Sequence, residues 1–290
     1  MGITATIVAD SVHRRGPGPR RLTTFQLRFP RFVLPELATH RMFSKNSASS
    51  RAIPIEKMVE DVLRDPAMFV FWGKNQKGMQ AATEMSADEI EGARADWLES
   101  RDSAVEQARK LLKRGLHKQN VNRLLEPFMH ITVLCTATDW ANFYCLRRDA
   151  MAQPEMQALA NAMWDAHSAS TPVDRTNLRG VNEWHLPLVG DEERFEFGDA
   201  AVLISIGRCA RVSYLRHDGV RDWQADIELA NRLSSSGHWS PFEHAAKPYV
   251  PSWWRRMLKL GDCSGNFSGW QQARKDWANE HPYTPGQVTP

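Results

Sequence analysis

The alternation of apolar and polar residues predicts the strands of the chain. Residues 3–12 and 22–34 alternate with a period of two, and the Gly-Pro turn at 16–19 joins them into a β-hairpin. A further strand is predicted over residues 129–136. The continuous apolar run within residues 201–214 is typical of a buried strand, so we expect a fourth strand there.

Apolar residues spaced three and four positions apart predict helices between these strands. The longest begins at Ser86, which forms an S-x-x-E capping box with Glu89, and it ends near Gly115. Pro154 stands in the first turn of another helix, where proline is tolerated. We expect helices over residues 53–65, 86–115 and 222–238, and two more that begin near 138–139 and 153–155.

Composition places the chain among ordinary globular proteins, because 42% of its 290 residues are hydrophobic and 24% are charged. No apolar run reaches the roughly 18 residues of a transmembrane helix. No signal peptide is evident either, so we expect a cytoplasmic protein without a membrane partner. A net charge of +3 is too mild to require a nucleic acid. The four cysteines form no CxxC pair, which argues against a zinc ribbon or a disulfide framework.

The segment ATHRMFSKNSASSRAIP, residues 38–54, carries the strongest local signal for a ligand. It contains Arg41, Arg51, a lysine and four serines but no acidic residue, so it offers many donors to an anion such as phosphate. Arg123 and Arg147, which lie elsewhere in the chain, could complete a phosphate clamp. From spacing alone, a solvated basic loop is an equally good interpretation.

Several common sites are excluded by their motifs. GHWSPFEH, residues 237–244, lacks the spacing of H-E-x-x-H, and a proline interrupts it, so zinc is not expected. The chain has no G-x-S-x-G elbow, no phosphate-binding G-x-x-x-x-G-K-[ST] loop and no G-x-G-x-x-G after a strand. A nucleotide cofactor would therefore bind by another route.

Four blocks of the chain together resemble the flavin-dependent thymidylate synthase family. THRMFSKNSASSR is similar to the family signature R-H-R-x-x-S-x-N-E-x-S-x-R, and NRLLEP is similar to its Arg-x-x-Leu-Pro corner. NFYCLRRDAMAQPE resembles its N-F-x-x-L-R-x-D-x-x-A-Q-x-E segment. ARVSY, followed by GHWSPFEH, resembles the segment that opens the family sequence.

The order of these blocks differs from that of the family. The block at 210–244 follows the other three instead of preceding them, so the resemblance implies a circularly permuted chain. It also implies an α/β (α+β) fold with a central, mostly antiparallel sheet flanked by helices. We interpret residues 1–290 as a single domain. Its segments are the motif-bearing residues 1–167, a connector at 168–200, the family's opening block at 201–248 and an aromatic, basic tail at 249–290.

The resemblance implies FAD as the cofactor, methylenetetrahydrofolate as the one-carbon donor, and NADPH or another reductant. It implies a homotetramer with active sites between subunits. The positions implied to bind FAD are His40, Arg41, Asn142, Arg147, Ser213, Ser240 and Glu243. The positions implied to hold deoxyuridylate (dUMP) are Ser49, Arg51, Arg123 and Arg147. Arg147, Ser49 and His238 are the implied catalytic positions, although His238 suits a helix C-terminal cap equally well.

Four positions depart from the family pattern. Glu36 stands in place of a glutamine, Thr39 of an arginine, Ser47 of a glutamate and Met151 of a histidine. Expected ligand groups are therefore missing from the site.

The tail offers replacements for these groups, and we hypothesise that Gln271 or Arg274 returns to the site. Three hypotheses about the function stay open. The first is transfer of a methyl group to C5 of dUMP. The second is capture of the one-carbon unit by water, which gives 5-hydroxymethyl-dUMP. The third is a non-catalytic nucleotide-binding relative.

Overall fold

The structure is a computed structural model, and it describes the chain in six stretches. These are residues 2–16, 18–51, 53–214, 222–250, 265–278 and 280, without the side chains of 213 and 214.

A five-stranded sheet forms the centre of the molecule, in the order β3-β4-β2-β1-β5. β1, β2, β4 and β3 pair antiparallel to their neighbours, and the short β5 pairs parallel to β1. The bounds are β1 Thr4–His13, β2 Arg20–Pro30, β3 Ser44–Ser47, β4 His130–Ala137 and β5 Val173–Asp174. The predicted mixed fold with a mostly antiparallel sheet is confirmed.

Helices surround this sheet, and most begin within three residues of the predicted positions. The capping box at the start of α3 is present, because Ser86 Oγ accepts from Glu89 N while the Glu89 carboxylate accepts from Ser86 N. No helix in the described stretches combines the length and apolar character that a membrane crossing requires. The bounds are α1 Leu34–Ala38, α2 Ile55–Arg64, α3 Ala87–Lys113, α4 Lys118–Val121, α5 Ala141–Arg147, α6 Pro154–Ala169, α7 Asp191–Phe197, α8 Ala200–Ala210 and α9 Trp223–Ser235.

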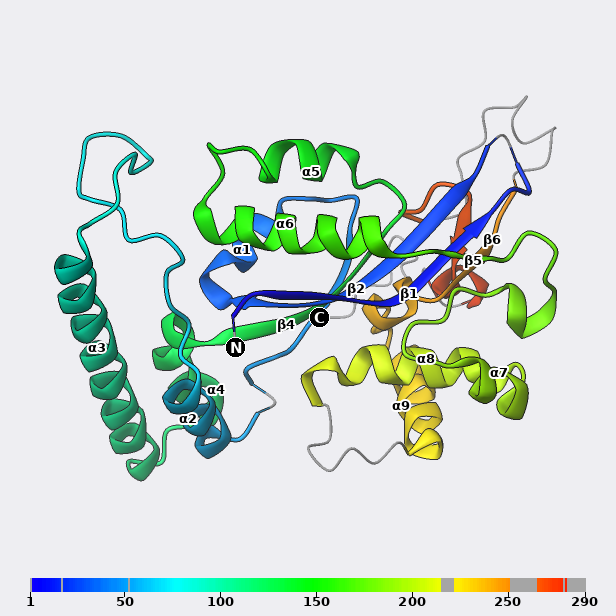
Figure 1. Cartoon of the computed structure of the whole chain (residues 1–290). Coiled ribbons are helices and arrows are strands. Elements are labelled where there is room, and N and C mark those ends of the chain that lie inside the picture. The colour runs from blue at the N-terminus through cyan, green and yellow to red at the C-terminus, as the bar shows by residue number, and fades with distance from the viewer. Residues whose placement is uncertain are drawn as a thin grey trace, which may run out of the picture.

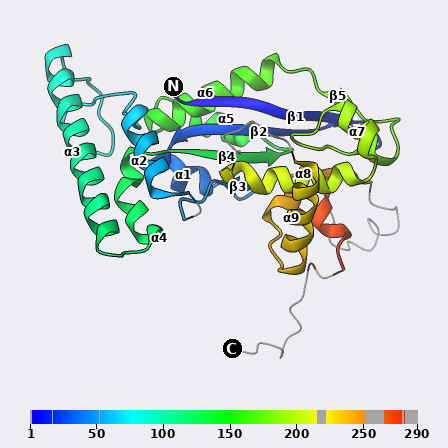
Figure 2. The same ribbon diagram turned by 90° about the horizontal axis from the view of Figure 1, so that it is seen from below.

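The helices form layers on both faces of the sheet and a group at one end. Figure 1 shows α5 and α6 on one face, α8 and α9 on the other, and α2, α3 and α4 beyond the end of the strands. In Figure 2, α8 runs alongside the strands, lower in the picture than β1, β2 and β4. Side chains follow this layering, since Val133 and Cys135 of β4 join the core under α6 while Leu134 packs against Cys209 of α8.

The expected strand over residues 201–214 is wrong, because these residues form α8 and a following 3-10 turn. A short run of buried apolar residues suits either a strand or a helix, so the pattern alone could not decide. As a helix, the run buries Val202 and Ile206 in one core cluster with Ala230 of α9. A Cβ atom at Gly207 would lie 2.2 Å from the Asp226 carbonyl oxygen, so glycine lets α8 pack closely on α9.

Two other segments also differ from expectation. The predicted strand 22–34 ends at Pro30, where a 3-10 turn leads into α1. The predicted connector 168–200 contains β5, a 3-10 turn at Gly180–Glu183 and α7. In the tail, β7 Trp270–Gln272 pairs antiparallel with β6 Ala246–Pro248, and the two strands form a small second sheet.

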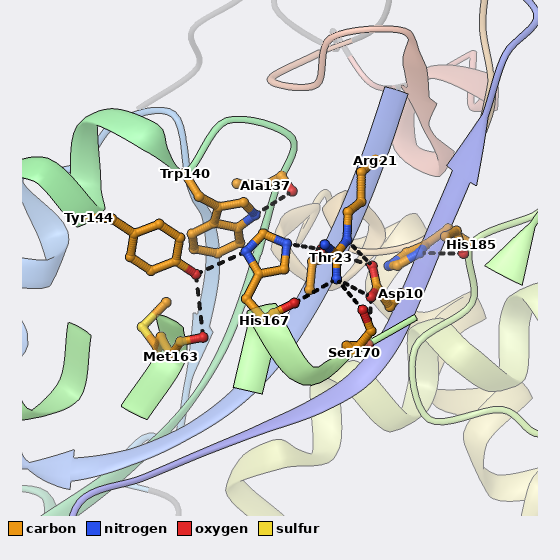
Figure 3. A network of polar contacts seen from close by, with 11 residues as sticks. Asp10, Arg21, Thr23, Ala137, Trp140, Tyr144, Met163, His167, Ser170 and His185 are labelled. Atoms are coloured by element: carbon orange, nitrogen blue, oxygen red, sulfur yellow. Dashed lines mark hydrogen bonds and ion pairs between the residues drawn. The ribbon is translucent and has the colours of Figure 1, made fainter. Parts of the chain in front are cut away.

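A polar network fastens the end of α6 to the sheet (Figure 3). Arg21 donates to both carboxylate oxygens of Asp10, at 2.9 and 2.6 Å, and to the carbonyl of His167 at 3.0 Å. The ring of His167 lies between Thr23 Oγ1, 3.3 Å away, and the Tyr144 hydroxyl, 3.1 Å away. Burial lowers the pKa of His167 to about 4, so the imidazole is neutral at pH 7. Through Tyr144 the network also fixes α5.

A second chain of hydrogen bonds, which we call the cross-sheet chain, connects the block 237–244 to the sheet. Ser11 Oγ, the His185 ring, Thr24 Oγ1, Thr136 Oγ1 and His244 Nδ1 follow one another at 3.0, 2.8, 2.7 and 2.7 Å. All five residues are buried. Burial lowers the pKa of His244 to about 3, and its Nε2 atom has no partner among the described residues.

Candidate functional site

The signature segment crosses the edge of the sheet at β3. Its first residues follow α1, its centre pairs with β4, and its last residues lead toward α2. β3 is an edge strand, so one side of its backbone is not paired within the described sheet. Several of the predicted site residues fall into groups at the two ends and the middle of this strand.

Glu36, Thr39, His40 and Arg147 meet at one end, and we call them the Arg147 cluster. The Arg147 guanidinium donates to His40 Nε2 at 2.9 Å, to Glu36 Oε2 at 3.1 Å and to Thr39 Oγ1 at 3.3 Å. Two predicted residues, His40 and Arg147, are thus brought together from distant parts of the sequence. Glu36 and Thr39, two of the residues that depart from the family pattern, accept hydrogen bonds from Arg147 and help to hold it in place.

The environment of His40 keeps its imidazole neutral. Burial lowers the pKa of His40, and the charges of Arg147 and Lys45 lower it further. Because Arg147 donates to Nε2, the proton of the neutral ring resides on Nδ1. Phe43 stacks on the ring at 5.5 Å and Phe143 meets it edge-on at 5.0 Å between centroids, which fixes its plane.

Arg31, Ser50, Arg123 and Glu126 meet beyond the other end of β3, and we call them the Glu126 cluster. Glu126 Oε1 accepts from Arg123 at 2.7 Å, lies 3.0 Å from an Arg31 nitrogen, and is 3.5 Å from Ser50 Oγ. One carboxylate therefore faces two guanidinium groups. Arg51 is exposed and adjacent to this cluster in the chain, with no ion-pair partner among the described residues. Positive charge is in excess here.

The middle of β3 contacts the block that the family places first. Asn46 Nδ2 donates to the Cys209 carbonyl at 2.6 Å, and Ser240 Oγ lies 3.5 Å from Asn46 Oδ1. Glu243 forms an ion pair with Arg274 at 3.2 Å. Ser240 therefore lies beside the signature, and Gln272 joins Glu243 to it, because its Nε2 donates to both the Glu243 carbonyl at 3.1 Å and Ser44 Oγ at 2.8 Å.

The tail does return to the signature, although through a different residue from those expected. Gln272 Nε2 donates to the buried Ser44 Oγ at 2.8 Å, whereas Gln271 contacts Asp276. Arg274 reaches Glu243, so of the two expected residues it is the one that contacts a predicted site residue.

Other predicted residues are not drawn into these clusters. Arg41 and Asn142 are exposed. Ser49 is half-buried in the segment after β3. The exposed His238 donates its backbone N–H to the Leu233 carbonyl at 2.9 Å, and its ring lies 2.9 Å from Ser236 Oγ, so it caps the end of α9. The Ser213 side chain lies outside the described part of the structure.

A cavity of about 1040 Å³ adjoins the Arg147 cluster. Glu36 and Arg147 line one side of it, and the start of α6 and the loop over residues 66–85 line the rest. The loop was not identified as functional from the sequence. Its length was the available signal, because structureless loops longer than about 12–15 residues are uncommon and often functional.

The comparisons with known proteins agree with the motif blocks. A sequence model described as thymidylate synthase complementing protein matches residues 21–173, which is more than half of the chain. This range holds three of the four blocks, and the block at 210–244 lies outside it. A search of curated proteins found no match.

Solved structures with a similar fold include two of a UMP/dUMP methylase, PolB, from Streptomyces cacaoi. The one bound with 5-Br dUMP is 20% identical, with a TM-score of 0.42, covering 51% of this chain and 67% of that one. The one bound with 5-Br UMP is 19% identical, with a TM-score of 0.45, covering 57% of this chain and 88% of that one. On the match over residues 21–173, the chain belongs to the family of thymidylate synthase complementing proteins, in agreement with its resemblance to the flavin-dependent thymidylate synthases.

Proposed function

We propose that this protein transfers a one-carbon unit from methylenetetrahydrofolate to C5 of dUMP with FAD as cofactor, in a thymidylate synthase-type reaction. The observation that carries the proposal is the Arg147 cluster, which joins two blocks of the family pattern that lie more than 100 residues apart. The family membership supports the same reaction class.

The clusters at the two ends of β3 match the two parts of a nucleotide: the Glu126 cluster the phosphate, and the Arg147 cluster the base. The Glu126 cluster and Arg51 supply an excess of guanidinium groups, which bind phosphate bidentately. Ser49 directly precedes Ser50 and Arg51 in the chain and supplies a further hydroxyl. We assign the dUMP phosphate to Ser49, Arg51 and Arg123.

Arg147 suits the base. A guanidinium has five N–H groups, and three of them are used by Glu36, Thr39 and His40, so five minus three leaves two for a ligand. A fixed guanidinium that donates to a uracil carbonyl stabilises the negative charge that develops on the ring when C5 attacks the one-carbon unit. The neutral His40 ring, stacked on Phe43 and met edge-on by Phe143, accepts from Arg147 and helps to hold it in this orientation.

The residues present fit a flavin without a Rossmann motif. The cavity is large, Arg41 is exposed and lacks an ion-pair partner among the described residues, and Asn142 presents an amide from the same helix as Arg147. His40, Arg41, Asn142, Arg147, Ser240 and Glu243 would hold the cofactor, together with Ser213. When bound, the flavin supplies the reducing equivalents of the reaction, and NADPH or another reductant would renew them.

The permuted order and the assembly are part of the proposal. The contacts from Asn46 to Cys209 and Ser240 support it, because they seat the block 210–244 on the signature strand as a permuted chain requires. The exposure of Arg41, Arg51 and Asn142 agrees with active sites that are completed between subunits of a homotetramer in the cytoplasm.

Hydroxymethyl transfer is a second candidate on the same scaffold. Met151, which replaces the family histidine, lines the cavity and is 72% exposed, so water can reach this part of the site. Capture of the one-carbon unit by water would then give 5-hydroxymethyl-dUMP.

Release of tritium from [5-³H]dUMP tests the proposal, because any substitution at C5 expels this hydrogen. The protein is incubated with FAD, methylenetetrahydrofolate, a reductant and the labelled nucleotide. We expect release that depends on both FAD and the folate. Absence of release from protein that still binds dUMP would favour the non-catalytic relative.

A further inference from the structure

Positive charge is concentrated where α3 turns into α4. Residues 107–125 contain six basic residues and no acidic one, whereas the whole chain has a net charge of +3, so the other residues together carry +3 − 6 = −3. We call the six residues the basic corner. They are Arg109, Lys110, Lys113, Arg114, Lys118 and Arg123. The mild net charge of the chain therefore hides a strong local excess.

The fold brings this stretch to the outer edge of the molecule. α3 buries Val105 and Ala108 in a core cluster with α2, and its basic residues from 109 to 114 are exposed. Gly115, with a φ of 86°, ends the helix, and α4 begins three residues later and packs back on α3. In Figure 1, α3 stands at the edge of the molecule, beyond the end of the strands. A large partner can therefore approach the corner from solvent.

Most of the charge at the end of α3 is not neutralised. Lys110 pairs with Glu106 at 2.6 Å, but both side chains are more than half exposed, so solvent screens the pair. Arg109, Lys113 and Arg114 have no ion-pair partner in the part of the chain that the structure describes. These three cations are available to an external anion.

Stabilisation of the helix does not account for the whole corner. The helix dipole favours cations in the last turn, and Lys110 and Lys113 lie there. Arg109 precedes Lys110, and Lys118 is the first residue of α4, where the dipole disfavours a cation. A partner with a high density of negative charge explains why the cations extend across both helices.

The composition of the corner favours a duplex nucleic acid over other anionic partners. Residues 107–125 contain no Phe, Trp or Tyr, so they offer no platform on which the bases of a single strand could stack. The apolar side of α3 is buried against α2 and cannot enter a membrane as an interfacial helix does. Exposed lysine and arginine side chains without aromatic neighbours suit phosphates, and a duplex carries one negative charge per about 1.7 Å of its axis.

We propose that the basic corner binds the phosphate backbone of a nucleic acid duplex without reading its sequence. The proposal is independent of the proposed reaction, because none of residues 109–118 is assigned to dUMP or FAD.

Fluorescence anisotropy of a labelled DNA duplex of about 20 base pairs tests the corner, with full-length protein between about 25 and 200 mM KCl. One variant combines Lys113→Gln with Arg114→Gln, because glutamine has nearly the helix propensity of the residues it replaces. The matched control combines Lys77→Gln with Arg94→Gln, which removes the same charge from exposed positions outside the corner. Circular dichroism melting shows that each variant is folded.

The salt dependence gives the expected magnitude. If the five residues from Arg109 to Lys118 each neutralise a phosphate, the logarithm of the binding constant falls with the logarithm of salt concentration with a slope of about −4.5. Loss of two contacts should reduce this slope by about 2 and weaken binding by about tenfold or more at about 50 mM KCl. We expect the control to keep the wild-type slope and affinity.

Absence of binding by the wild-type protein at about 25 mM KCl overturns the proposal. An equal effect of the control pair also overturns it, because binding would then follow the net charge and not the corner. Tighter binding to a single strand, to phosphatidylserine vesicles or to polyglutamate overturns the duplex as the partner. Tritium release separates the two proposals: its absence in wild-type protein rejects the proposed function and leaves the result with DNA unchanged.

Discussion

Thr136→Val tests the cross-sheet chain, which seats the block 237–244 on β4. Valine has nearly the shape of threonine, so the substitution removes the hydroxyl and leaves the packing in place. Thr136 Oγ1 is 2.7 Å from both Thr24 Oγ1 and His244 Nδ1. Thr24 keeps a second partner, His185 Nε2, at 2.8 Å.

The size of the expected loss of stability follows from the hydrogen bond that His244 loses. Its Nε2 atom has no partner among the described residues, so without the Thr136 hydroxyl neither nitrogen of the fully buried ring has a hydrogen-bond partner there. An unsatisfied buried polar group costs about 1–3 kcal/mol, and the lost hydrogen bond to Thr24 adds about 0.5–1.5 kcal/mol. We expect the free energy of unfolding to fall by about 1.5–4.5 kcal/mol.

Urea unfolding, followed by tryptophan fluorescence, measures this change. Thr132→Val is the matched control, because Thr132 lies on the same strand, is half-buried, and makes no side-chain hydrogen bond among the described residues. We expect the control to change the free energy by less than about 0.5 kcal/mol. A fall of less than about 1 kcal/mol for Thr136→Val would refute the account of the chain.

Three further predictions concern pH, the base site and the tail. Acid should destabilise the fold between pH 6.5 and about 4, because burial lowers the folded-state pKa of several histidines, so the unfolded state binds more protons. Each such histidine lowers the free energy of unfolding by about 1.4 kcal/mol for every pH unit below 6.5, down to its folded-state pKa. The loss is measured as a fall in the urea midpoint. Above pH 6.5 these histidines do not change the stability. The histidines with the clearest shifts are His130, His167, His185 and His244. Arg147→Lys loses the bidentate fork and should lower tritium release by about 10–100-fold, whereas the exposed Arg148→Lys should stay within about threefold; equal effects would contradict the role of Arg147. Arg274→Ala removes the partner of Glu243 and should weaken FAD binding by about three- to tenfold in a fluorescence titration, and unchanged affinity would end the hypothesis that the tail completes the site.

Local signals in the sequence located most elements. The capping box at Ser86, the proline in the first turn of α6 and the turn-linked strand patterns of β1 and β2 each act within a few residues, and the structure has all of these elements. α8 was misassigned, because a short buried apolar run suits a strand or a helix equally well. Its close packing on α9 at Gly207 is a tertiary contact that sequence periodicity does not contain.

In the candidate site, too, the sequence predicts some residues and misses those that depend on tertiary contacts. The family pattern named His40 and Arg147, and the structure joins them. It did not name Glu126, which pairs with both Arg31 and Arg123, nor Gln272, which reaches Ser44 across 228 positions of sequence. Such pairs form only when distant segments meet, so no local spacing reveals them. Glu36 was noted as a departure, yet its role as a partner of Arg147 appears only in three dimensions.

The mass of the nucleotide product tests the central claim most directly. The protein is incubated with FAD, dUMP, methylenetetrahydrofolate and a chemical or nicotinamide reductant, and the nucleotide is analysed by mass spectrometry. The account predicts the gain of one methyl group on the base, which is thymidylate. Gain of a hydroxymethyl group would contradict methyl transfer in favour of the second candidate, and no gain by protein that binds both FAD and dUMP would contradict one-carbon transfer to dUMP altogether.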